Sequence, residues 1–317
     1  MLAVHRAFDL PTRLEENRWL VEELWAEEAV GIVGGEPKCC KSFLALEMAV
    51  AVASGRPALR RFRVPRPGPV LVFAAEDALH EVRHRLDGIA SRAGVELASL
   101  DVYVISVPVV RLDRAEDCHE LEATVARFSP RLLVLDPFVR LHRVDENVSS
   151  EVAPLLAYLR ELQRRHQTGV LLVHHARKGA SHVRGGQALR GSSELHAWGD
   201  SNLYLRRRAE ALELTIEHRA APAGVPLPLT LAVRERSVAL EILEQRPEVP
   251  DAAAAPDPRQ RIEQVLADAP SPLPLQKLRS ACQMRMSTLC TTLATLTEQG
   301  RVVKASGSYS LAATSTG

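Results

Sequence analysis

The sequence predicts an α/β fold, with a mostly parallel central sheet flanked by helices and a small second domain at the C-terminal end. Three observations lead to this prediction. Apolar runs of four to six residues alternate with helical stretches, as in parallel sheets whose strands are buried on both faces. The first run passes through a glycine-containing loop into an apolar helix. A stretch rich in proline and alanine then separates the last fifth of the chain from the rest.

Each element is expected from its own pattern of apolar residues. Continuous apolar runs predict strands at 29–34, 70–75, 131–136 and 169–173, and a shorter run predicts a short strand at 102–105. Apolar residues at helical spacing predict helices at 43–53, 78–93, 115–128 and 151–167. Alternating patterns predict antiparallel strands that extend the sheet at 211–218, 229–233 and 237–243.

We expect the chain to have four parts. They are an N-terminal lead-in segment (1–28) that covers the sheet edge, the α/β domain (29–246), a linker (247–258) and a C-terminal domain (259–317). The last part combines three short helices with a hairpin in about 55 residues. This is the winged-helix pattern, a variant of the helix-turn-helix.

Composition excludes several classes of protein. The chain has 317 residues, 46% apolar and 25% charged, which is ordinary for a globular protein. The formal net charge is +1, so any nucleic-acid surface must be local. The five cysteines show no C-x-x-C spacing, which predicts neither a zinc site nor a disulfide framework. Because the sequence lacks a long apolar span and a signal-peptide core, we expect a cytoplasmic protein without a membrane partner.

The loop after the first strand has the character of a phosphate-binding loop. It reads GGEPKCCKS from Gly34 to Ser42, close to the pattern G-x-x-x-x-G-K-[ST]. Its backbone N–H groups and the following helix N-terminus would face an anion. Lys41 would reach the outer phosphates, and the Ser42 hydroxyl would hold Mg²⁺. The candidate nucleotide-binding residues are Gly35, Glu36, Pro37, Lys38, Cys39, Cys40, Lys41, Ser42 and Phe43.

Cys40 stands where the common pattern has glycine. If the backbone there needs a positive φ, the Cβ strains the loop. In that case we also expect the thiol, close to Lys41 and a helix N-terminus, to have a lowered pKa. The alternative is an ordinary helical conformation in which Cys40 packs as a small apolar residue. A strand, turn and helix with a chance Lys-Ser pair is the simplest interpretation of the whole loop, and the strand ends downstream argue against it.

Three later strands end in polar side chains, where open α/β sheets bind ligands. The strand at 70–75 runs into Glu76 and Asp77, and we expect Asp77 to cap the next helix while Glu76 takes part in chemistry. Asp136 ends the fourth strand, as expected for a carboxylate that orients Mg²⁺. The fifth strand ends in a histidine pair. We interpret His175 as a γ-phosphate sensor and His174 as structural, because no partner cluster has metal-ligand spacing.

A glycine-rich basic stretch follows the histidine pair. Its composition suits a loop with phosphate-facing cations, although a solvated surface loop has the same composition. The candidate DNA-binding residues are Arg177, Lys178, Arg184 and Arg190.

Five segments in this order carry a family resemblance: GGEPKCCKS, VLVFAAED, LLVLDPF, GVLLVHHARK and LRGSSEL. They resemble the RecA-type ATPases of the RepA hexameric-helicase group, over about residues 15–240. The resemblance implies a RecA-like P-loop core and an ATPase that uses ATP and Mg²⁺. It also implies a homo-oligomer, with a hexameric ring as the expected form, that acts on single-stranded DNA as a helicase.

The resemblance also implies roles for individual residues. Lys41 and Ser42 would form Walker A, Asp136 would be the Walker B acid, and Glu76 would activate the attacking water. His175 matches the sensor, Arg206 or Arg207 the arginine finger that reaches a neighbouring subunit, and 177–190 the DNA-facing central loop. Two other functions fit the same residues. One is a nucleotide-gated DNA-binding regulator without strand separation, and the other is an ATPase whose C-terminal domain contacts protein.

Overall fold

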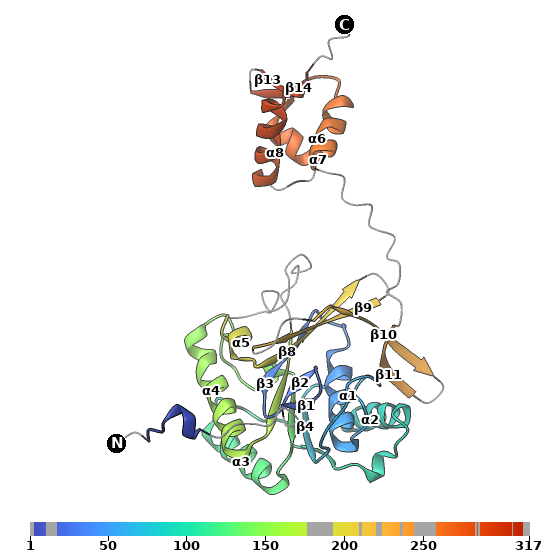
Figure 1. Ribbon diagram of the computed structural model, residues 1–317, viewed down its shortest axis with the longest axis vertical. Helices are drawn as coiled ribbons and strands as arrows, with labels where there is room; N and C mark the ends of the chain where they lie inside the picture. Colours follow the sequence, from blue (N-terminus) through green and yellow to red (C-terminus); the bar gives the residue numbers. More distant parts are fainter. Residues whose placement is uncertain are drawn as a thin grey trace. The chain divides into compact units, whose positions relative to one another are not determined.

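The computed structural model describes residues 3–10, 18–175, 193–208, 211–219, 224–234, 237–243, 258–282, 284, 286–305 and 307–312. The chain divides into two compact units, Met1–Pro247 and Glu248–Gly317 (Figure 1). In the described part of the chain, no helix has both the length and the apolar character needed to cross a lipid bilayer.

A nine-stranded sheet organises the first unit, with the strand order β11-β10-β9-β8-β3-β7-β6-β4-β5. Strands β3 to β8 run parallel, and β9, β10 and β11 continue the sheet antiparallel beyond β8. The parallel strands are β3 (Val30–Gly35), β4 (Val70–Ala74), β5 (Val102–Val104), β6 (Leu132–Asp136), β7 (Gly169–His175) and β8 (Ser201–Arg208). The antiparallel ones are β9 (Ala211–His218), β10 (Leu227–Arg234) and β11 (Ser237–Ile242). The predicted α/β fold with a mostly parallel sheet is confirmed.

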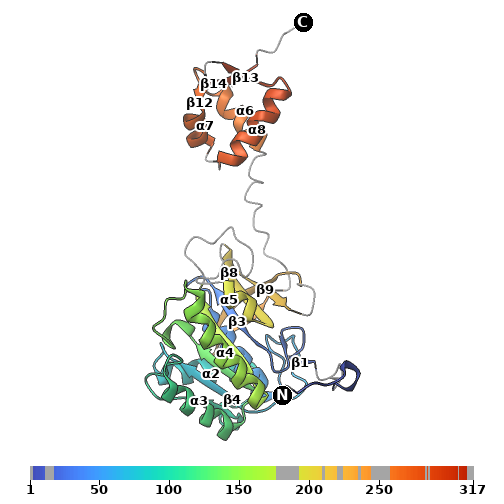
Figure 2. The same cartoon turned by 90° about the vertical axis from the view of Figure 1, so that its left-hand side faces the viewer.

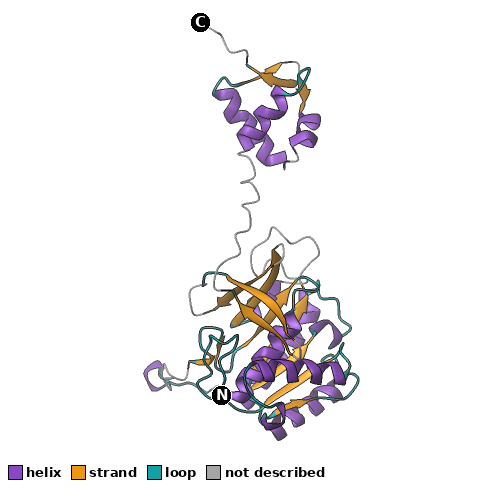
Figure 3. Ribbon diagram, turned by 90° about the vertical axis from the view of Figure 1, so that its right-hand side faces the viewer, coloured by secondary structure: helices purple, strands orange, loops and turns teal. Residues whose placement is uncertain are grey.

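Helices cover both faces of this sheet (Figures 2 and 3). Side chains alternate along each strand, so the buried strands contribute to two separate apolar clusters. One cluster joins the sheet to α1 (Lys41–Ser54) and α2 (Leu79–Arg92). The other joins it to α3 (Ala115–Phe128) and α4 (Ser149–His166). The short helix α5 (Ser193–Trp198) and the 3₁₀ turns η1 (Ala7–Asp9), η3 (Leu97–Ser99) and η4 (Phe138–Arg140) complete the unit.

The described part of the lead-in segment, residues 3–10 and 18–28, does not pair with an edge strand of the sheet, contrary to the prediction. It forms a hairpin of β1 (Trp19–Val21) and β2 (Trp25–Ala26), whose Ala26 N–H donates to the Ser201 hydroxyl at the start of β8 (3.0 Å). The Trp25 ring lies where a side chain on Gly31 would be, 2.9 Å from an ideal Cβ. The hairpin thus packs at the amino ends of central strands, where Trp25 is fully buried.

The second unit contains three helices and a small antiparallel sheet with the order β12-β14-β13. Its helices are α6 (Pro258–Ala267), α7 (Leu275–Cys282) and α8 (Met286–Glu298). Its strands are β12 (Leu273–Pro274), β13 (Val302–Ala305) and β14 (Ser308–Leu311). Leucines at helical spacing on α8 meet Ile262, Leu278 and Val302 in an apolar core of its own. The third strand, β12, was not expected, because two residues carry no alternating pattern.

Candidate active site

A pocket of about 240 Å³ lies at the carboxyl ends of β3, β4, β6 and β7. It collects side chains that are far apart in the sequence, as expected for a parallel sheet whose strand ends share one edge. The residues that line it are Lys38, Cys39, Cys40, Lys41, Ser42, Phe43, Glu76, Arg85, Asp136, Val173 and His175. The structure therefore brings together the predicted phosphate loop, Glu76, Asp136 and His175, whereas Gly35, Glu36 and Pro37 form the loop behind this lining.

The phosphate loop connects β3 to α1 in a shape that leaves the helix N-terminus open. The N-cap residue, Cys40, makes no side-chain capping bond, so the first N–H groups of α1 have no side-chain partner there. The loop begins at Gly35, where an added Cβ would lie 2.3 Å from the Leu205 carbonyl oxygen. Only glycine fits that close approach, and the uncapped helix end beyond it suits an anion.

Lys41 is held inside the loop. Its side chain is 5% exposed, and its Nζ donates to the Glu36 carbonyl (2.8 Å) and lies 3.9 Å from Cys39 Sγ. Burial lowers the pKa of this amine, opposed by nearby Cys39 and Asp136. A phosphate that replaced these weak partners would form stronger, charge-assisted hydrogen bonds with the Lys41 ammonium.

Asp136 and Ser42 face each other across the pocket. Burial raises the pKa of Asp136 to about 6, and a hydrogen bond from the Ser42 hydroxyl and the Lys41 charge act against that rise. A carboxylate and a hydroxyl beside a phosphate site form the oxygen donor set that suits Mg²⁺. No group of three or more His, Cys, Asp or Glu side chains in the described ranges could hold a metal. The pair fits Mg²⁺ shared with a nucleotide, because Mg²⁺ commonly takes one or two protein oxygens and completes its shell with phosphate and water.

Because the pKa of Asp136 is raised, we expect Mg²⁺-dependent nucleotide affinity to fall in acid. In the ligand-free fold the carboxyl binds a proton below pH 6, whereas the unfolded chain does so only near pH 4. This group therefore adds stability to the ligand-free protein as the pH falls through 6, and the same proton competes with Mg²⁺. We expect Mg·ATP affinity to drop about tenfold per pH unit below pH 6.

Calorimetric titrations between pH 5 and 8 would measure this effect, and parallel titrations without Mg²⁺ would report protonation of the nucleotide itself. Asp136→Asn should bind weakly at every pH. An Mg²⁺-dependent affinity that stays flat from pH 7 to 5 would contradict a raised pKa.

Glu76 extends from the end of β4 into the pocket and pairs with Arg140, whose Nε donates to Glu76 Oε1 (2.7 Å). Both side chains are largely exposed, so this ion pair is easily exchanged for another partner. The prediction that Asp77 caps the next helix is wrong. The N-cap of α2 is Ala78, and Asp77 accepts both hydrogen bonds of the Arg85 guanidinium instead. A bidentate arginine is a stronger partner for the carboxylate than one backbone N–H.

The two histidines at the end of β7 have different surroundings. His174 is buried, with its ring 6.1 Å from Phe138 and its Nδ1 3.8 Å from a Glu146 oxygen. His175 lines the pocket, and burial, followed by the Lys41 charge, lowers its pKa. Its buried Nδ1 has no hydrogen-bond partner among the described residues. A neutral imidazole that lines the pocket has one ring N–H, which can donate to a ligand there.

Cys40 adopts the left-handed conformation that the sequence raised as one alternative, with φ 64° and ψ 29°. The helical alternative is therefore excluded. The expected lowering of the thiol pKa is wrong, because burial raises the pKa of Cys40 more than Arg207 and Lys41 lower it. The sequence places the thiol near a helix N-terminus, but it does not show that the folded loop buries the thiol.

We expect Cys40→Gly to stabilise the protein, because a left-handed backbone costs about 1 kcal/mol more with a Cβ than without one. The melting temperature of the ligand-free protein should rise by about 2–4 °C. ATP affinity or turnover should rise as well. Cys40→Ala keeps the Cβ and removes the thiol, so it is the matched control and should gain nothing. Equal melting temperatures for the two variants would argue against strain in the loop.

The candidate arginine fingers lie next to each other on β8 but point to opposite faces of the sheet. Arg207 reaches the phosphate loop of its own subunit, where its Nη2 donates to the Lys38 carbonyl (3.0 Å). Arg206 lies opposite Glu213 in the β8–β9 register. The predicted DNA-binding residues Arg177, Lys178, Arg184 and Arg190 lie outside the described residues.

Two arginines of this site were missed by sequence reasoning. Arg85 lines the pocket, stacks over Phe43 at 5.2 Å and pairs with Asp77. Arg140 pairs with Glu76 from the turn η4. Neither arginine belongs to a motif. Both arginines come from elements that follow the strand-end carboxylates, and nothing in the local pattern pairs them with Glu76 or Asp77.

Comparison with known proteins agrees with this geometry. An AAA domain family, AAA_25, matches residues 3–181. Three solved structures share the fold. They are an ATPase domain solved on its own (14% identity, TM-score 0.54, 68% of this chain and 86% of that chain), a DnaB-like replicative helicase (14%, 0.51, 67% and 57%) and the RadB recombinase (18%, 0.50, 69% and 92%).

The chain thus spans a little over half of the DnaB-like helicase. At these identities the likenesses establish the fold, and the family is established by a match over more than half of the chain. The protein belongs to the AAA_25 family, and its α/β core is that of a RecA-like P-loop ATPase.

Proposed function

We propose that this protein is an Mg²⁺-dependent ATPase that acts on DNA as a ring-forming, helicase-like motor. The observation that carries the proposal is the pocket in which an open helix N-terminus, Lys41, Asp136 and Glu76 converge. Such a pocket can bind a polyphosphate, neutralise it and place a base beside it.

Each residue has a distinct role in this proposal. The loop N–H groups and Lys41 bind the phosphates, and Ser42 and Asp136 would hold Mg²⁺. The ion would neutralise charge on the transferred phosphoryl group. Glu76 orients and deprotonates the attacking water once Arg140 yields the carboxylate, and His175, which lines the pocket, donates a ring N–H to the terminal phosphate.

A ring would place an arginine of β8 next to the γ-phosphate of a neighbouring subunit. Arg207 already binds its own phosphate loop, so we assign the finger role to Arg206 and a loop-supporting role to Arg207. The names of two similar structures, a replicative helicase and a recombinase, support a function on DNA.

We propose that the basic stretch 177–190 contacts single-stranded DNA and that the second unit is a winged-helix domain. Three helices and a three-stranded sheet in that unit support the second assignment. Helix α8 carries no lysine or arginine, so phosphate contacts would come from elsewhere on the unit. The alternative is a nucleotide-gated DNA-binding regulator, in which ATP controls assembly and no strands are separated.

Two measurements test the proposal and separate it from this alternative. ATP hydrolysis should be stimulated by single-stranded DNA, and a forked duplex should be separated in the presence of Mg·ATP. A regulator would bind DNA in an ATP-dependent manner without separating strands. Absence of both hydrolysis and ATP binding would overturn the ATPase assignment.

A further inference from the structure

The N-terminal segment of the first unit exposes apolar side chains. Residues 3–10 are all exposed, and Val4, Phe8 and Leu10 are 86%, 90% and 52% accessible. Phe8 lies in the turn η1, between Ala7 and Asp9. A phenylalanine so exposed loses its hydrophobic stabilisation unless something covers it, and clustered exposed apolar residues mark interaction sites.

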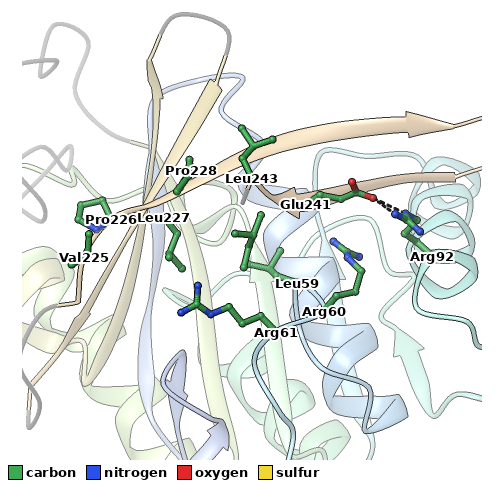
Figure 4. Close-up of a pocket in the computed structure, with 11 residues that line it drawn as sticks. Leu59, Arg60, Arg61, Arg92, Val225, Pro226, Leu227, Pro228, Glu241 and Leu243 are labelled. Carbon is green, nitrogen blue, oxygen red and sulfur yellow. Dashed lines mark hydrogen bonds and ion pairs between the residues drawn. The ribbon is translucent and has the colours of Figure 1, made fainter. Parts of the chain in front are cut away.

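A groove with the matching character lies on the same unit. One cavity of about 660 Å³ opens between the loop after α1 and the strands β10 and β11 (Figure 4). A second cavity of about 390 Å³ adjoins it, and the two share Arg61, Val225 and Leu227. We call the two together the Arg61 groove. Its walls include Trp19 and Phe62 in the second cavity and Leu59 in the first. Figure 4 shows the Arg60 and Arg61 side chains extending from the loop toward the strands.

The groove has one unpaired charge of each sign among the described residues. Arg92 is bound to Glu241, and Arg60 is bound to the Leu240 carbonyl and close to Glu47. Arg61, in contrast, is exposed and pairs with no carboxylate in the described ranges, and its guanidinium lies over the Phe62 ring at 5.5 Å.

Glu23 supplies the unpaired carboxylate of the second cavity, since no described residue pairs with it. The N-terminal segment carries the complementary charges three residues apart, with Arg6 and Asp9 on either side of Phe8. Apolar surfaces framed by complementary charges are typical of specific interfaces.

We propose that the Arg61 groove binds the N-terminal segment of a second copy of this chain, with Phe8 inserted among the apolar walls and Asp9 facing Arg61. The segment is exposed rather than seated in its own groove, which leaves both surfaces available to other subunits. A donor segment on one face and an acceptor groove on another make a head-to-tail contact, and such contacts close into rings or extend into filaments. This inference rests on the proposed self-assembly and specifies the surface responsible for it.

Two variants of the full chain test the contact from its two sides. Phe8→Asp disables the donor segment, and Arg61→Glu disables the groove. Mass photometry across a range of concentrations should show oligomers for the unmodified protein. Each variant should self-associate at least about 30-fold more weakly, the size expected for losing a central anchor.

An equimolar mixture of the two variants gives the most discriminating experiment. One intact donor and one intact groove make a single interface, so the mixture should form dimers and nothing larger. Asp9→Arg combined with Arg61→Glu in one chain should restore assembly by reversing both charges. Val303→Asp, at an exposed valine of the second unit, is the matched control and should assemble normally.

Unchanged assembly of both Phe8→Asp and Arg61→Glu, or an unmodified protein that stays monomeric, would overturn the proposal. ATP affinity is measured in parallel on every sample. Intact ATP binding with unchanged assembly would refute the docking contact alone, whereas loss of ATP binding in the unmodified protein would refute the proposed function.

Discussion

Lys41→Ala is expected to weaken ATP binding at least about 100-fold, because each charge-assisted hydrogen bond to a phosphate contributes about 1.5–3 kcal/mol. The buried Nζ is held at the base of the loop by one carbonyl and one thiol, so the phosphates would be its first strong partners. Calorimetry with Mg·ATP would measure the loss.

Lys38→Ala is the matched control for Lys41→Ala. Lys38 belongs to the same loop and lines the same pocket, but its side chain is exposed. Its removal should cost ATP affinity less than about tenfold, the size of an exposed charge contact. Equal affinities for Lys41→Ala and the unmodified protein would remove the basis for the phosphate site.

Glu76→Gln is expected to bind ATP normally and to hydrolyse it at least about 100-fold more slowly, the loss expected when a catalytic base is removed. Glutamine keeps the shape of the side chain but cannot take a proton from water. Single-turnover hydrolysis, measured beside equilibrium binding of ATP, would separate the two effects.

Arg140→Ala provides the comparison for this second variant. It removes the partner of Glu76 and leaves the carboxylate in place, so turnover should change far less than in Glu76→Gln. If Glu76→Gln hydrolyses ATP at the original rate, the carboxylate acts only as a partner of Arg140.

The strands, the helices and the phosphate loop followed from local pattern. Helix 115–128 and strand 211–218 were predicted with the bounds that the structure has, because their periodicity is strong and their ends carry turn signals. The left-handed backbone at Cys40 was also foreseeable, since a motif position that favours glycine reports a backbone requirement.

What failed depended on packing and on side-chain partners that local pattern does not specify. Asp77 has the composition of a cap, but Arg85 two turns later offers a better partner. The pKa of Cys40 depends on burial, which a helix end and a neighbouring lysine do not reveal. The lead-in segment was misplaced because its hairpin packs against the start of β8, where the Ala26 N–H donates to the Ser201 hydroxyl, and β8 lies far from it in the sequence.

The segments that flank the basic stretch 177–190 on both sides contact the nucleotide pocket or its phosphate loop. His175, at its start, lines the pocket, and β8, after its end, returns through Arg207 to the phosphate loop. We therefore expect a ligand that binds between these two points to be linked thermodynamically to the nucleotide. If ATP raises the affinity of that stretch for a ligand by some factor, the ligand must raise ATP affinity by the same factor. The coupling free energy can thus be measured in two ways. One titrates ATP at a fixed concentration of the ligand, and the other titrates the ligand at a fixed concentration of ATP.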